Sequence, residues 1–170
     1  MKYLLAFVLV MAGFLIWSHI EGYRLNVTPS LAKGIYRITD KAPKRGDIVA
    51  VCLSGSMAEL ARERGYIQSG SCPSGLRPLL KILAALPYDK IIPLETGISC
   101  LSPEGLACFW PAVAKKVDSL GRPVLPAEIS GIVPAGKALI FTLHDGSFDS
   151  RYFGFLPLES MKKVIPILTF

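Results

Sequence analysis

Ser30 and Lys81 are the two residues of this 170-residue chain whose types suggest a nucleophile and its base. A serine hydroxyl is a poor nucleophile until a base that is unprotonated at the working pH takes its proton. The chain has only two histidines, and Lys81 is the well-placed alternative. It lies in an apolar stretch bracketed by Pro78 and Pro87, so it is a candidate for a desolvated amine. The two residues could therefore act as a nucleophile and its base.

Lys81 can serve as the base only if its pKa falls by several units. At the ordinary value near 10.4, about one lysine amine in a thousand is neutral near pH 7.4. Burial among aliphatic neighbours such as Leu80 and Ile82 disfavours the charged form and lowers the pKa. A carboxylate touching the amine would oppose this shift, so a neutral partner is expected.

His144 offers an alternative base, since Asp145 and Asp149 follow it closely and could complete a Ser-His-Asp triad. Triad members are brought together by the fold and are seldom neighbours in sequence. The pattern therefore favours the lysine.

The N-terminal segment is a candidate membrane helix. An uncharged run from Leu4 to Trp17 follows Lys2 and extends to Ile20. Its length is short for a membrane span but longer than most signal-peptide cores, and no small-residue cleavage site follows it. We expect a retained anchor over residues 1–20, with a cleaved signal as the alternative. Residues 21–170 then form one domain.

The four cysteines show neither a CxxC pair nor nearby paired histidines, which argues against zinc. Sequence proximity favours Cys52 with Cys72 and Cys100 with Cys108 among the three possible pairings. Each bridge would contribute about 3 kcal/mol in the chain-entropy model. Disulfides and an export segment together predict a domain in the periplasm. The net charge of +6 is scattered along the chain, so no nucleic-acid partner is expected.

Short apolar runs separated by turns predict a mainly β domain, and 15 Gly with 13 Pro supply the turns. Residues 79–86 fit a buried strand or two helical turns equally well. The other expected elements are strands at 35–38, 46–53, 91–94, 138–143 and 163–168, a short helix at 56–64, a Gly/Ser loop at 69–75, and a hairpin plus an irregular excursion at 96–123.

Three segments in this order resemble the signal peptidase I superfamily, and more closely the TraF-type peptidases of conjugative plasmids. They are Thr28-Pro29-Ser30-Leu31, Lys81 in its apolar stretch, and Asp145-Gly146-Ser147-Phe148-Asp149-Ser150-Arg151-Tyr152-Phe153-Gly154. The last six residues, from Asp149 to Gly154, are the strongest signal. The resemblance covers nearly all of the chain. It implies a coiled β-sheet domain with short helical and loop excursions, preceded by one membrane helix.

The resemblance also implies the roles of the site residues. Ser30 is then the nucleophile and Lys81 the general base, and the family needs neither metal nor cofactor. The oxyanion is held by the backbone N–H of Ser30 and the hydroxyl of Thr28. Ser147 corresponds to the serine that orients the lysine amine.

Asp149 and Arg151 correspond to a buried ion pair that braces the same loop. In the TraF-type branch this aspartate is itself counted in the catalytic set, so Asp149 stands with Ser30 and Lys81 as a predicted catalytic residue.

Two positions complicate the resemblance. Ser54-Gly55-Ser56-Met57 copies the nucleophile motif of ordinary signal peptidases, which makes Ser56 an alternative nucleophile. It follows the Gly46-Asp47 strand, however, whereas the family nucleophile precedes it. Tyr88 stands where many relatives have glycine after the lysine strand, and we expect it to require a different turn conformation.

The sequence thus predicts a serine-lysine endopeptidase anchored in the inner membrane with its catalytic domain in the periplasm. The resemblance implies that it matures a conjugative pilin precursor beside other transfer proteins, through an acyl-enzyme and head-to-tail cyclisation. The alternatives are a general signal peptidase acting on exported preproteins and a non-catalytic assembly component of a type IV secretion apparatus.

Overall fold

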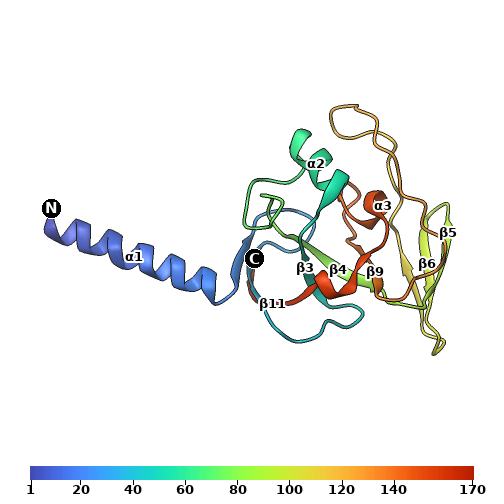
Figure 1. Cartoon of the computed structure of the whole chain (residues 1–170), viewed down its shortest axis with the longest axis horizontal. Helices are drawn as coiled ribbons and strands as arrows, with labels where there is room; N and C mark the ends of the chain where they lie inside the picture. Colours follow the sequence, from blue (N-terminus) through green and yellow to red (C-terminus); the bar gives the residue numbers. More distant parts are fainter.

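The N-terminal helix α1 (Lys2–Ile20) projects from the body of the molecule in this computed structural model, which describes residues 1–170 (Figure 1). None of its residues is buried. Its length and composition are sufficient to cross a membrane, and an N-terminal signal sequence would pass the same test. At its end, Arg24 donates to the His19 carbonyl and Arg37 pairs with Glu21 at 3.1 Å, which tie the helix to the domain.

Seven strands form the main sheet, and every strand pair in it is antiparallel. The mainly β prediction is confirmed. In order across the sheet, the strands are β1 (Tyr23–Asn26), β2 (Gly34–Ile38), β11 (Lys162–Thr169), β3 (Ile48–Val51), β4 (Leu79–Ala85), β9 (Lys137–Phe141) and β10 (Leu156–Pro157).

A second sheet lies at the far end of the domain from α1 (Figure 1). Its order is β7 (Ala107–Trp110), β6 (Gly97–Leu101), β5 (Lys90–Leu94) and β8 (Gly131–Ile132). The predicted hairpin within residues 96–123 is β6–β7. Buried residues of both sheets, among them Ile91, Ile98, Leu139 and Phe141, form one cluster that joins the sheets.

The ambiguous stretch at 79–86 is strand β4, because it pairs with β3 on one side and β9 on the other. The expected helix is α2 (Gly55–Glu63). The sequence did not predict β1, the short helix α3 (Ser150–Phe153) or the 3-10 turn η1 (Leu158–Ser160). All three have four residues or fewer, too few for a clear hydrophobic period.

Both disulfides have the predicted pairing. Cys52–Cys72 joins the end of β3 to the excursion after α2, with Cα atoms 5.5 Å apart. Cys100 and Cys108 lie opposite each other on β6 and β7, with Cα atoms 5.0 Å apart. The two bridges therefore fix the excursion and the hairpin to their neighbouring strands.

Tyr88 contradicts the expectation of a different turn conformation. Its φ is 73°, and it is the one non-glycine residue with positive φ. The turn is held by Asp89, whose amide donates to the Leu86 carbonyl while its carboxylate accepts from the Leu86 amide at 2.8 Å. Arg45 completes it by pairing with Asp89 at 2.6 Å. These contacts hold a tyrosine in a conformation that glycine adopts more readily.

Candidate active site

Ser30 lies in the turn between β1 and β2, and this turn is organised by a buried asparagine. Asn26, the last residue of β1, is 5% exposed. Its side-chain amide donates to the carbonyls of Thr28, Leu31 and Ala32 and accepts from Thr28. The hydroxyl oxygens of Thr28 and Ser30 lie 3.2 Å apart. The candidate nucleophile and the candidate oxyanion donor are therefore adjacent.

Lys81 occupies the third position of β4, opposite Val49 of β3, and is only 3% exposed. Val49 and Leu83, on the same face of the sheet, are fully buried in an aliphatic cluster. The Lys81 Nζ donates to the Ser147 Oγ at 2.7 Å. A neutral hydroxyl, not a carboxylate, is thus the partner of this buried amine.

Burial lowers the pKa of Lys81 to about 8. The negative charge of Asp149 opposes this shift, and the positive charge of Arg151 assists it. A pKa near 8 leaves about one amine in five neutral at pH 7.4, against about one in a thousand for an exposed lysine. The site therefore meets the condition that a lysine base requires.

Asp149 forms a buried ion pair with Arg151. The guanidinium donates to both carboxylate oxygens, at 2.9 and 2.7 Å, and both side chains are buried. The carboxylate also accepts from the backbone amides of Thr142 and Arg151. Arg151 in turn donates to the carbonyl of His144, which accepts from the Ser147 amide. The ion pair thus braces the loop that carries the lysine's partner.

The structure forms two expected contacts, Lys81 with Ser147 and Asp149 with Arg151, and it also places the hydroxyls of Thr28 and Ser30 in contact. No hydrogen bond joins Ser30 to Lys81. The two halves of the candidate site come from separate elements, because the nucleophile lies in the β1–β2 turn and the base on β4.

The alternative residues lack the expected partners. Ser56 is an exposed residue in the first turn of α2. His144 is exposed, and its ring Nδ1 accepts from the Gly146 amide at 3.1 Å, so its contact is local to the turn.

The role of Asn26 was missed in the sequence. An Asx residue two positions before Thr28 is a signal for a side-chain-stabilised turn, but it does not show that the side chain is buried.

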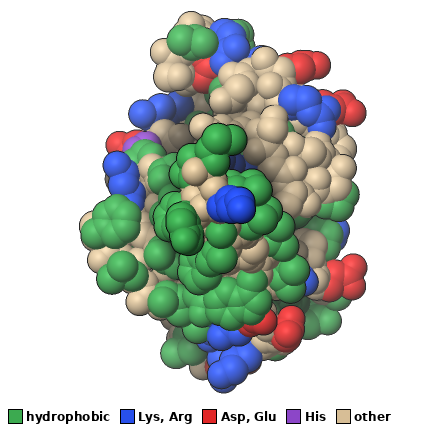
Figure 2. All heavy atoms as spheres, turned by 90° about the vertical axis from the view of Figure 1, so that its left-hand side faces the viewer, with side chains coloured by type: hydrophobic (Ala, Val, Ile, Leu, Met, Phe, Trp, Pro, Cys, Tyr) green, Lys and Arg blue, Asp and Glu red, His purple; other side chains and the backbone are tan.

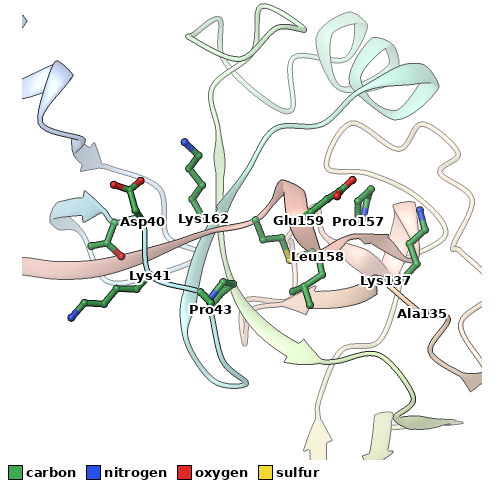
Figure 3. A pocket seen from close by; sticks show the side chains of 13 residues that line it. Asp40, Lys41, Pro43, Ala135, Lys137, Pro157, Leu158, Glu159 and Lys162 are labelled. Atoms are coloured by element: carbon green, nitrogen blue, oxygen red, sulfur yellow. The ribbon is translucent and has the colours of Figure 1, made fainter.

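A cavity of about 800 Å³ lies away from these residues (Figure 3). The β2–β3 connection, the start of β9 and the segment from β10 to β11 form its walls. Five charged side chains line it, and none of the candidate catalytic residues does. The five are Asp40, Lys41, Lys137, Glu159 and Lys162.

Comparison with known proteins decides the family. The chain is 39% identical over 140 residues to a protein of Sinorhizobium fredii named "Probable conjugal transfer protein TraF", covering 80% of this chain and 71% of that protein. It is 33% identical over 166 residues to the "Conjugal transfer protein TraF" of Agrobacterium fabrum, covering 95% and 91%. The chain belongs to the TraF family of conjugal transfer proteins.

A third relative extends the TraF family beyond these genera. The "Plasmid transfer protein TraF" of Escherichia coli is 31% identical over 157 residues, which cover 89% of this chain and 85% of that protein. No protein-family model matches the chain. Membership of the TraF family supports a role in conjugative transfer.

Proposed function

We propose that this chain is a serine-lysine peptidase of the signal peptidase I type that matures a conjugative pilin. One observation carries the proposal: a lysine amine is buried on an aliphatic strand face and hydrogen-bonded to a neutral serine at 2.7 Å. The carboxylate whose charge acts on this amine, that of Asp149, forms an ion pair with Arg151. A buried amine without a carboxylate partner is costly for the fold, and it is the arrangement that a lysine base needs.

In the proposed reaction, the Ser30 oxygen attacks a peptide carbonyl while its proton passes to the Lys81 amine. The Ser30 N–H and the Thr28 hydroxyl stabilise the oxyanion, and one such donor contributes roughly 3 kcal/mol. The attack requires the Ser30 hydroxyl to turn from Thr28 toward the amine. Lys81 then returns the proton to the leaving amine, and an acyl-enzyme remains.

The nucleophile of the second step determines the product. Water releases a linear chain, whereas the N-terminal amine of the same pilin closes a head-to-tail amide. We propose cyclisation as the outcome. It requires that the amine be held beside the acyl group and that water be excluded.

The proposed location is the inner membrane, with the domain in the periplasm. In a view along α1, hydrophobic side chains, those of the helix included, fill the middle of the molecule (Figure 2). Three exposed apolar residues, Leu25, Ile35 and Leu168, lie in register across β1, β2 and β11 beside the nucleophile turn. The two disulfides are typical of an oxidising compartment. Ser30 would then act near the membrane surface.

The first test is mass spectrometry of a candidate pilin co-expressed with the chain. The wild type is expected to give a processed product lighter by one water than the linear peptide, and Ser30→Ala is expected to leave the precursor unprocessed. Ser56→Ala is the matched control and should process normally. A linear product would favour the general signal peptidase, and pilus assembly that is intact with Ser30→Ala would favour the non-catalytic component.

The pH dependence should follow the lysine. Because the neutral amine is the base and burial lowers its pKa to about 8, kcat/KM should rise about tenfold per pH unit below 8 and level off above it. Measuring kcat/KM on a pilin-derived peptide from pH 6 to 10 checks this. A plateau that begins below pH 6.5 would instead indicate a histidine or a carboxylate as the base.

A further inference from the structure

The orientation of the Asn26 amide is fixed by its surroundings. Its nitrogen faces three backbone carbonyls, those of Thr28 at 3.3 Å, Leu31 at 3.2 Å and Ala32 at 3.0 Å. Turning the amide over would direct its oxygen at three acceptors, so only one orientation satisfies them. The oxygen therefore faces Thr28.

This orientation determines where the hydroxyl protons lie. The Asn26 oxygen accepts from the Thr28 hydroxyl at 2.7 Å and from the Thr28 amide at 3.2 Å. A threonine hydroxyl has one proton, and the amide oxygen cannot donate. Since that proton is used toward Asn26, the 3.2 Å contact between the two hydroxyls must have Ser30 as its donor. The chain of donation runs from Ser30 to Thr28 to Asn26.

We propose that Asn26 is a positioning residue that sets the Thr28 hydroxyl proton and, through it, the direction of the Ser30 hydroxyl. The inference rests on the proposed function. In the resting site both protons are turned away from the positions that acyl transfer requires. Asn26 thus stabilises a resting state in which the Thr28 and Ser30 hydroxyls must reorient before acyl transfer can occur.

In the proposed reaction, the hydroxyl protons of Ser30 and Thr28 each change partner once. When the Ser30 proton passes to Lys81 and the Ser30 oxygen bonds the carbonyl carbon, Thr28 loses its incoming hydrogen bond. The Thr28 proton then turns from the Asn26 oxygen to the oxyanion. The Asn26 oxygen keeps the bond from the Thr28 amide, and its nitrogen keeps the three carbonyls, so the turn stays in place while the hydroxyl changes partner.

The competing explanation is that Asn26 only holds the turn together. Tyr36 provides a matched control, because its buried hydroxyl donates to the Ala32 carbonyl at 2.6 Å and bonds neither Thr28 nor Ser30. Tyr36→Phe removes a bond to the same turn and keeps the ring that packs in the core. It is expected to change kcat/KM by less than about threefold.

A double-mutant cycle separates the two explanations. Thr28→Val is expected to lower kcat by roughly 10²-fold, the effect of losing one oxyanion donor, with KM little changed. Asn26→Ala keeps that donor but no longer fixes its direction, so it is expected to lower kcat by a smaller factor, about threefold to tenfold. If Asn26 acts through the Thr28 hydroxyl, the double variant should be no slower than Thr28→Val alone. A double variant slower than Thr28→Val by the full factor of Asn26→Ala would overturn the proposal, because Asn26 would then act without that hydroxyl.

A second measurement does not depend on peptidase activity. In the full chain in detergent micelles carrying Ser30→Ala, the Thr28 hydroxyl proton should exchange slowly with water and show an NMR contact to the Asn26 side chain. Adding Asn26→Ala should abolish that protection, whereas adding Tyr36→Phe should retain it. Fast exchange with Asn26 present would overturn the proposal even if the chain proved to be inactive. If this proton exchanges slowly but the wild-type chain does not process the pilin, the results would contradict only the proposed function.

Discussion

Replacing Lys81 by methionine is expected to reduce the rate of pilin processing by about 10³-fold to 10⁴-fold. Methionine keeps an unbranched apolar side chain on β4 but removes the amine that would accept the Ser30 proton. A general base contributes up to about 10⁴-fold, and a serine without a base is a poor nucleophile. Single-turnover processing of a pilin-derived peptide, followed by mass spectrometry, measures the effect.

The variant should not lose activity through unfolding. Burial depresses the Lys81 pKa to about 8 in the folded chain, so the unfolded chain binds the lysine proton more tightly. At pH 7 this difference lowers the unfolding free energy of the wild type. This loss of unfolding free energy disappears as the pH rises from about 8 to above 10. Lys81→Met removes it, so the unfolding free energy at pH 7 should not fall.

Lys33→Met is the matched control, since Lys33 is exposed and lies three residues after Ser30. It should leave processing unchanged. If Lys81→Met retained more than a tenth of the wild-type rate while Ser30→Ala was inactive, another group would be the base.

The sequence predicted the parts of the structure that depend on local pattern. Apolar runs located the strands that hold Lys81, and sequence proximity paired the cysteines correctly. The stretch around Lys81 could not be assigned as helix or strand from its own residues, because continuous apolarity fits either. Hydrogen bonds from β3 and β9, which lie far away in sequence, decide that it is a strand.

The remainder of the site depends on contacts that no local pattern shows. Asn26 reads as an ordinary turn residue, yet its burial lets one side chain make five hydrogen bonds to the turn. Tyr88 has a glycine-like φ because Asp89 and Arg45 hold the turn around it. At Tyr88, the ion pair with distant Arg45 helps to outweigh the conformational preference of the residue.

Replacing Arg151 by methionine is expected to lower the unfolding free energy by about 3 to 5 kcal/mol. The change leaves the carboxylate of Asp149, which has no exposed surface, without its counter-ion. It also removes the bond to the His144 carbonyl that holds the loop of Ser147. Urea denaturation at pH 7 in detergent micelles measures the loss.

Arg37→Met provides the contrast, because the Arg37–Glu21 pair is exposed at both side chains and such pairs contribute less than about 1 kcal/mol. The double variant Asp149→Asn with Arg151→Met should recover part of the loss, since it leaves no uncompensated charge. A single Arg151→Met variant as stable as Arg37→Met would mean that water reaches the carboxylate and that the ion pair does not brace the loop.

The same Arg151→Met substitution should also move the activity profile to higher pH. Burial is the main cause of the low Lys81 pKa, Asp149 opposes it and Arg151 assists it. Removing the guanidinium takes away the assisting charge while the opposing carboxylate stays, so the Lys81 pKa rises. In the double variant the carboxylate is absent as well, and the profile should return toward that of the wild type. A base other than Lys81 would not be expected to show this paired shift and return, so the two profiles test the ion pair and the identity of the base together.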